Sequence, residues 1–277
     1  MTEPGGFPSL GERLRSRWDR FRAAVADDPG RVAEAGVSIL VVVLATALVL
    51  ATLHPADLWR DTTPTGGDMG AHVWGPRYLL DHLLPHFRLT GWTPDWYNGF
   101  PAYQFYMVIP SLLIVILHVG LTWWMAVLVV AAALALVVLA WARESLYRYR
   151  WIAFGVAAAV TLLAVPVPYN RAFKLVTALG LLGVPVACWA FAKLSDLPFP
   201  IPPLASAAGV LFVYNREPLF NNTGNIIGGN FQSTMAGEFA FSISLTLAVL
   251  YLGVAVRGLR TGRHRALAAG LFALAGL

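Results

Sequence analysis

Long uncharged apolar stretches alternate with polar segments along most of the chain. The first, 37–53, is long enough to cross the hydrocarbon core of a bilayer with little tilt. A long polar segment precedes it and no small-residue cleavage site follows it, so the pattern predicts a signal anchor and not a cleaved signal peptide. Further apolar runs occupy 123–141, 151–167, 175–191, 201–213, 239–256 and 266–277. Because the last run stops within a span, we expect the chain to be the front part of a longer protein.

The apolar runs divide the chain into four regions. Residues 1–36 carry apolar side chains at helical spacing between arginines, which predicts an amphipathic helix on the cytoplasmic lipid surface; a solvated tail is the alternative. Residues 37–53 form the first transmembrane helix, and 54–122 an extracytoplasmic loop with short amphipathic helices. Residues 123–277 form a transmembrane bundle. The run 103–117 is short and contains Pro110, so we interpret it as a re-entrant segment that begins and ends outside.

The distribution of basic residues gives the expected orientation, because cytoplasmic loops are enriched in arginine and lysine. With the N-terminus in the cytoplasm, 14 of the 20 basic residues lie inside. The outer side then holds Arg60, Arg77, Arg88, Arg171, Lys174 and Arg216. Eighteen of the 20 are arginine, which together with alanine-rich helices is typical of a high-GC bacterial genome. The sequence therefore predicts a multi-pass protein of the bacterial cytoplasmic membrane.

Composition excludes several classes of protein. The chain is 57% hydrophobic and only 13% charged, whereas a soluble domain has about 25% charged residues. The single cysteine, Cys188, excludes a disulfide scaffold and a cysteine-based zinc site. The net charge of +5 mainly records membrane topology, so we expect no nucleic-acid partner. The fold class expected is an all-α integral membrane protein, a polytopic helical bundle.

The first candidate site is Asp68 in the segment 66–72, where two glycines allow a tight turn. His72 follows four residues later, so one helical turn would bring it to the same side. Asp68 could act as a general base or hold a divalent cation, Mg²⁺ or Mn²⁺. The alternative is that Asp68 only caps the helix that follows.

A second candidate lies in the segment 91–101, where aromatic rings surround one carboxylate. Trp92, Trp96 and Tyr97 could stack on a sugar ring while Asp95 accepts its hydroxyls. The alternatives are an aromatic belt at the lipid headgroups and an Asx turn at Asp95.

Two further groups lie at expected outer helix starts. Asn170, Arg171 and Lys174 could hold a lipid phosphate, or the two cations could snorkel to ordinary headgroups. Glu238 opens an apolar helix, where an acid is costly unless paired or hydrated; stabilising the helix dipole is the alternative. The segment 214–238 before it is rich in asparagine and glycine, so we expect an irregular loop there and not a helix.

A family resemblance rests mainly on residues 66–110. Its motif residues are Gly67, Asp68, His72, Trp74, Trp92, Asp95, Gly99, Pro101, Phe105, Tyr106 and Pro110. They resemble the start of the bacterial membrane proteins called 6-pyruvoyl-tetrahydropterin synthase-related, which are similar in layout to GT-C glycosyltransferases. Those enzymes use polyprenyl-phosphate sugars and place an acidic residue in a large first outer loop.

The resemblance implies a GT-C-like bundle, with Asp68 as base or cation-binding acid and Asp95 in a substrate loop. Two features depart from the GT-C pattern: Met69 stands where an adjacent acid is common, and the outer C-terminal domain is missing. The pterin part of the family name finds no chemical support, since a pterin synthase needs a three-histidine zinc site.

The first hypothesis for function is therefore a glycosyltransferase. It would transfer a sugar from a polyprenyl-phosphate donor to a cell-envelope glycan or protein on the outer face. The second is a lipid or lipid-linked-glycan flippase, although the apolar runs carry few of the ionisable residues that ion-coupled transport needs. The third is a non-catalytic scaffold for an envelope-assembly complex.

Overall fold

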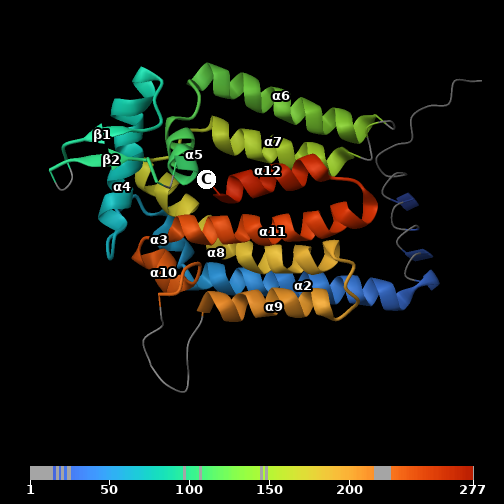
Figure 1. Ribbon diagram of the computed structural model, residues 1–277. Coiled ribbons are helices and arrows are strands. Elements are labelled where there is room, and N and C mark those ends of the chain that lie inside the picture. Colours follow the sequence, from blue (N-terminus) through green and yellow to red (C-terminus); the bar gives the residue numbers. More distant parts are fainter. Residues whose placement is uncertain are drawn as a thin grey trace, which may run out of the picture.

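The computed structural model describes residues 15–16, 19, 22–23, 26–95, 98–105, 108–143, 146, 149–214 and 226–276 (Figure 1). Most of the expected N-terminal amphipathic helix lies outside the described residues. So do Trp96 and Tyr97.

Four of the described helices are long and apolar enough to cross a membrane, so the expected all-α membrane character is confirmed at this level. They are α2 (Pro29–Thr52), α6 (Trp123–Ala142), α8 (Tyr169–Leu194) and α11 (Phe239–Thr261). The shorter apolar helices are α5 (Val108–Val119), α7 (Arg150–Ala164), α9 (Ile201–Tyr214) and α12 (Arg265–Gly276).

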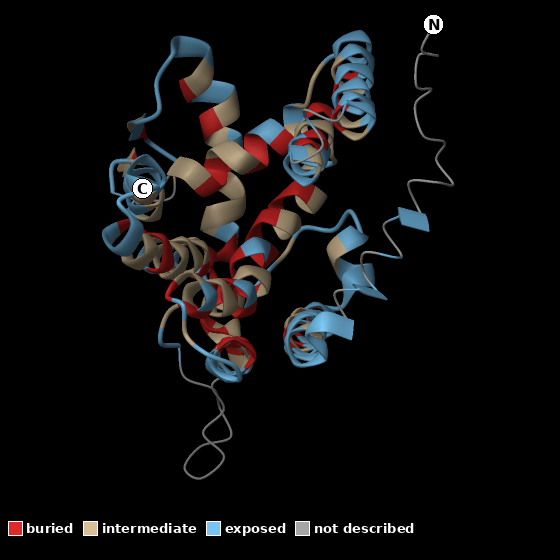
Figure 2. Ribbon diagram, turned by 90° about the vertical axis from the view of Figure 1, so that its right-hand side faces the viewer, coloured by how far each residue is buried: buried red, intermediate tan, exposed pale blue. Residues whose placement is uncertain are grey.

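Helix α8 is the centre of the bundle. Half of its most apolar window is buried, against 17–22% in the other three long helices, and it packs on α11, α9, α2 and α5. Glycines allow the close approach to α11, because a Cβ at Gly180 would lie 2.5 Å from the backbone N of Ile243. Buried residues gather where helices meet, and the outward faces are largely exposed (Figure 2). Exposed faces this rich in apolar side chains are suited to lipid.

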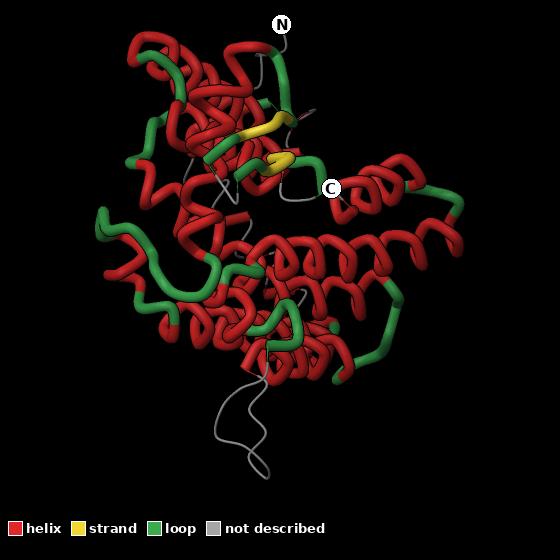
Figure 3. The backbone as a smooth tube through the Cα atoms, turned by 60° about the vertical axis from the view of Figure 1, so that its left-hand side comes forward, coloured by secondary structure: helices red, strands yellow, loops and turns green. Residues whose placement is uncertain are grey.

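The polar connections at one end of the bundle form a small layer of their own, on the left in Figure 1. It contains α3 (Pro55–Trp59), α4 (Met69–Tyr78), the π-helical turn η1 (Leu79–Leu83), the 3₁₀ turn η2 (Leu84–His86) and α10 (Phe231–Ala236). An antiparallel hairpin joins β1 (Gly91–Thr93) to β2 (Phe100–Ala102), with Trp92 opposite Pro101 (Figure 3).

Helix α5 begins and ends at this same end of the bundle, whereas α6 and α7 meet at the opposite end (Figure 1). The carbonyl of Leu117 in α5 accepts a hydrogen bond from the N–H of Val167, just before α8. The segment from α3 to α5 and the starts of α8 and α11 therefore lie at one end of the bundle. The re-entrant path of 103–117 stays a prediction.

The structure departs from the sequence-based expectations at two places. Helix α10 corrects the expectation of an irregular loop over 214–238: the Asn230 side chain accepts from the N–H of Ser233 at 2.9 Å and starts a helix that contains no glycine. Helix α2 begins at Pro29, before the apolar run, because Asp28 accepts from the N–H of Arg31 at 2.9 Å. Both caps are made by side chains whose type favours that position.

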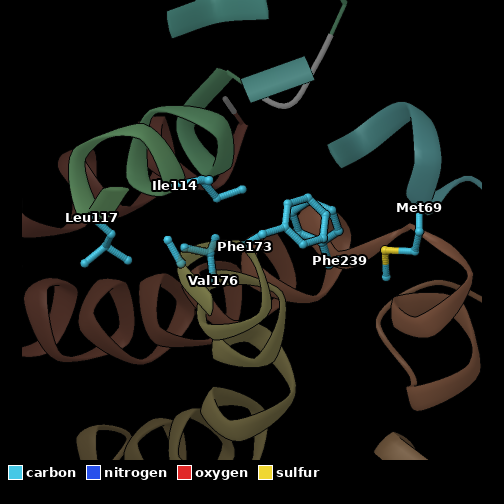
Figure 4. Close-up of a cluster of buried hydrophobic side chains, with 7 residues drawn as sticks. Met69, Ile114, Leu117, Phe173, Val176 and Phe239 are labelled. Carbon is cyan, nitrogen blue, oxygen red and sulfur yellow. The ribbon is translucent and has the colours of Figure 1, made fainter. Parts of the chain in front are cut away.

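A buried apolar cluster fixes the start of α4 against α5, α8 and α11. Its members include Met69, Ile114, Leu117, Phe173, Val176 and Phe239 (Figure 4). The rings of Phe173 and Phe239 meet edge to face with centroids 5.4 Å apart. Because Met69 follows Asp68 and Phe239 follows Glu238, this cluster brings the two candidate acids to one region.

Candidate active site

Two glycines allow the chain before α4 to dock on the end of α10. Gly66 and Gly67 have φ angles of +105° and +49°, which side chains other than glycine rarely adopt. The N–H of Asp68 donates to the carbonyl of Ala236 at 2.7 Å. A Cβ at Gly67 would lie 2.2 Å from that same carbonyl oxygen. The position of Asp68 therefore depends on the absence of a side chain at residue 67.

Gly237 provides the second close contact, in the turn between α10 and α11. A Cβ on this residue would lie 2.8 Å from Cδ2 of His72 and 3.1 Å from Cβ of Asp68. The His72 ring also meets Phe239 edge to face at 5.6 Å. Asp68 and His72 thus lie directly on the turn that carries Glu238.

A cavity of about 620 Å³ brings three of the expected residues together. Asp68, His72 and Glu238 line it, and Phe241, Ser244 and Ala275 continue its wall along α11 and α12. One part of the cavity is therefore lined by carboxylates and an imidazole, and another part by mostly apolar helix surface. That combination suits a ligand with a polar group and an apolar chain.

Neither acid caps its helix. Asp68 and Glu238 occupy the N-cap positions of α4 and α11, but neither side chain makes a capping hydrogen bond. Asp68 and Glu238 are thus N-cap residues by position, and their side chains do not satisfy a backbone N–H of the helix that follows. Both remain close to the positive end of a helix dipole, which favours negative charge there.

Burial lowers the pKa of His72 below its ordinary value of 6.5, and the charge of Asp68 opposes this shift in part. Desolvation is the larger cause, so the imidazole is neutral near pH 7. A neutral imidazole beside a carboxylate gives the cavity two groups that can accept a proton.

Among the described residues, no three His, Cys, Asp or Glu side chains gather closely enough to hold a metal ion. A Mg²⁺ or Mn²⁺ ion at Asp68 would therefore need further oxygen ligands from water or from a substrate phosphate. Magnesium is commonly bound in that way, by one or two carboxylates together with phosphate oxygens.

The second candidate group lies apart from this cavity. Trp92 and Asp95 belong to the β1–β2 hairpin, and neither lines the cavity of Asp68. Trp92 is 67% exposed. The N–H of Asp95 donates to Oγ1 of Thr93 at 3.2 Å, so the threonine side chain helps to close this turn.

The third group holds the start of α8 to the α3 region. Nζ of Lys174 donates to the carbonyls of Asp57 and Arg60 and to Oγ1 of Thr62, at 2.8–2.9 Å. The same helix start provides a hydrogen bond from Asn170 to Asp61 at 3.1 Å and the stacking of Arg171 on Trp59 at 5.5 Å. Lys174 lines a separate, largely apolar cavity of about 490 Å³. These contacts give the group a structural role.

Sequence reasoning missed Gly237, Phe241 and the end of α12 as parts of the site. Gly237 could have been suspected, since it adjoins Glu238 and a glycine beside a helix start often marks a close approach. Phe241 and Ala275 carry no such signal, because apolar residues within apolar helices are not distinguishable by type. Comparison of the chain with protein-family models, with curated proteins and with solved structures gives no significant match.

Proposed function

We propose that the chain is the core of a GT-C-like glycosyltransferase in the bacterial cytoplasmic membrane. It would transfer a sugar from a polyprenyl-phosphate donor to a cell-envelope glycan or protein on the outer face. The observation that supports this proposal is the single cavity lined by Asp68, His72 and Glu238 that continues along α11 and α12. A lipid-linked sugar has the matching chemistry, with hydroxyls at one end and a hydrocarbon chain at the other.

The reaction assigns a separate role to each polar group. Asp68 accepts the proton of the acceptor hydroxyl as the oxygen attacks the anomeric carbon of the sugar. The bond from that carbon to the phosphate oxygen breaks, and its electron pair leaves with the polyprenyl phosphate. Glu238 accepts hydrogen bonds from sugar hydroxyls, and His72, neutral near pH 7, is the second group able to take the proton.

The proposed orientation places the cavity outside. The N-terminal end of α2 and the basic residues after α11 lie at the opposite end of the bundle (Figure 1), and basic residues favour the cytoplasmic side. Arg263 lies in the α11–α12 connection, and Arg265 is the first residue of α12. Cysteine labelling of intact cells at Thr65 tests this placement, and protection of that site from an impermeant reagent would refute it.

The substitution Asp68→Asn tests the assignment of the base. Membranes carrying the protein are supplied with polyprenyl-phosphate-linked, radiolabelled hexose and pentose donors, and label in the envelope fraction is measured. We expect loss of transfer by about 10²–10⁴-fold, the usual contribution of a general base, without loss of the protein from the membrane. Unchanged transfer would remove Asp68 from the mechanism.

Asp196→Asn is the matched control, since Asp196 lies in the α8–α9 connection at the other end of the bundle and pairs with Arg257 and Arg260. It should transfer sugar as the unmodified protein does. Reconstituted vesicles provide the second control, because translocation of the lipid-linked sugar without a new glycosidic bond would replace the enzyme proposal by a flippase. Full complementation by a variant lacking Asp68, Asp95 and Glu238 together would favour a scaffold.

A further inference from the structure

A second polar group lies on the face of α4 that points away from the Asp68 cavity. Arg77 follows Asp68 by nine residues, about 2.5 helical turns, which places the two on opposite faces. Nη1 of Arg77 lies 3.2 Å from Nε2 of His118, and its guanidinium carbon lies 5.1 Å from the centre of the Tyr169 ring. Asp81 is 3.8 Å from Nε of Arg77.

The contacts of His118 define the direction of these hydrogen bonds. Nδ1 of His118 lies 3.1 Å from the carbonyl oxygen of Val167, and a carbonyl can only accept. Nδ1 is therefore the donor, and Nε2 accepts from Arg77. A guanidinium has five N–H groups, and the contacts described here use only part of them. The side chain of Arg77 is about half exposed, so N–H groups remain available to a ligand.

An apolar groove of about 460 Å³ is lined by residues that are neighbours of Arg77 and His118 in the chain, although these two do not line it themselves. It lies between η1, α5, α6 and α7, and Leu80, Val115, Val119, Val129 and Leu163 are among its lining residues. Leu80 is three residues from Arg77, and Val119 adjoins His118, whose Nε2 lies 3.2 Å from the guanidinium. These neighbours link Arg77 to the groove. The α5–α6 turn closes one side, where a Cβ at Gly120 would lie 2.6 Å from the backbone N of Pro166.

We propose that this groove binds one hydrocarbon chain of an anionic lipid whose phosphate contacts Arg77. The aliphatic lining offers water no hydrogen-bond partners, so the groove favours the hydrocarbon chain of a lipid over water. A planar guanidinium with N–H groups to spare matches the paired oxygens of a phosphate. The ion pair with Asp81 is 3.8 Å long and half exposed, so it leaves the guanidinium accessible.

The lipid site is independent of the proposed sugar transfer. The groove and the Asp68 cavity have no lining residue in common. A lipid in the groove contacts α5, α6 and α7, whose contacts with the rest of the bundle are few apart from those of α5 with α8. We infer that the lipid completes the packing between the α6–α7 pair and the small polar layer that contains α4 and η1.

Native mass spectrometry of the full chain tests the site. The protein is extracted from vesicles made of equal parts of phosphatidylglycerol and phosphatidylcholine, and the lipid retained per protein is counted. We expect phosphatidylglycerol to be retained preferentially. Arg77→Gln should lower its retention about tenfold, the loss expected for one charge-assisted hydrogen-bond contact. Arg88→Gln, at an exposed residue of the same layer, should leave retention unchanged.

A pair of tryptophan substitutions tests the chain-binding part. Val129→Trp fills the groove and should lower retention of the lipid, whereas Leu128→Trp, at a neighbouring residue that is 63% exposed, should not. Thermal melting of each variant shows whether it is folded. Equal retention of the two lipids by the unmodified protein, or no effect of Arg77→Gln, would overturn the phosphate contact. Undiminished retention in a folded Val129→Trp protein would overturn the groove as the site of the chain.

Discussion

Replacing Gly67 by alanine should open the contact between the start of α4 and the end of α10. The φ of +49° at Gly67 costs an ordinary residue roughly 1–2 kcal/mol. The new Cβ would lie 2.2 Å from the carbonyl oxygen of Ala236, and backbone must move to relieve that clash. The atom that must move is the one that accepts the N–H of Asp68, a hydrogen bond that contributes about 0.5–1.5 kcal/mol.

These two contributions sum to about 1.5–3.5 kcal/mol, a roughly 10- to 300-fold rise in the population with this contact open. Amide hydrogen exchange of the peptide 66–72 in detergent measures that population, because exchange at Asp68 needs the contact to open. We expect faster exchange by this factor at the start of α4, while α8 exchanges as before.

Gly70→Ala is the matched control. Gly70 lies within α4, its φ is ordinary, and a Cβ there meets nothing within 4 Å. Alanine at this position should leave exchange at Asp68 close to that of the unmodified protein, since the added Cβ meets nothing within 4 Å. If Gly67→Ala exchanged like the unmodified protein, the docking of Asp68 on α10 would not depend on the glycine, and the proposed geometry of the cavity would be wrong.

Three further predictions concern pH, the helix core and the α3 region. Burial lowers the pKa of His72 below 6.5, so the unfolded chain takes up a proton at a pH where the folded protein still resists it. The contribution of His72 to stability is therefore intact above pH 6.5 and is lost as the pH falls. Between about pH 7 and pH 5.5, the melting temperature of the His72→Gln variant should fall less than that of the unmodified protein. Gly180→Ala should lower the melting temperature, since its Cβ would lie 2.5 Å from backbone in α11, whereas Gly36→Ala, with nothing within 4 Å, should not. Lys174→Met removes three hydrogen bonds to the α3 region and should speed amide exchange over 57–63 while exchange at Asp68 stays unchanged.

The apolar pattern located the helices because burial in lipid requires long uninterrupted apolar segments. The run 123–141 matches α6, and 239–256 lies within α11. The ends of the helices were harder to predict from the apolar pattern. Helix α8, for example, begins at Tyr169, six residues before its apolar run. Its first turn extends into the polar layer, where Lys174 and its neighbours make hydrogen bonds to α3, so polarity there does not mark a loop.

The hairpin was missed although the sequence held a signal for it. Asn98 and Gly99, at the end of the connection 94–99, both have positive φ angles, +62° and +140°, and asparagine and glycine are the residues that favour such turn positions. Aromatic composition drew attention to this segment as a sugar platform instead. The hydrogen bonds of Lys174 could not be predicted, since two of its three acceptors are backbone carbonyls, which every residue has.

The i, i+4 spacing predicted that Asp68 and His72 would lie together, and both line the same cavity. The position of Glu238 beside them could not be predicted from the spacing of residues along the chain, because it depends on a contact between segments far apart in the sequence. That contact is the hydrogen bond from the N–H of Asp68 to the carbonyl of Ala236. Local patterns therefore supplied the members of the site, and long-range backbone docking supplied its assembly.

The N-caps of this chain distinguish structural residues from candidate functional ones. Asp28 and Asn230 each accept a backbone N–H at 2.9 Å and start α2 and α10, a contribution of about 1 kcal/mol apiece. Asp68 has the same side chain as Asp28 and occupies the same kind of position, yet it forgoes that hydrogen bond. Glu238 does so too, and both line one cavity. At Asp68 the capping stabilisation that Asp28 provides is not realised, and under the proposed function the carboxylates of Asp68 and Glu238 instead face the ligand of the cavity they share.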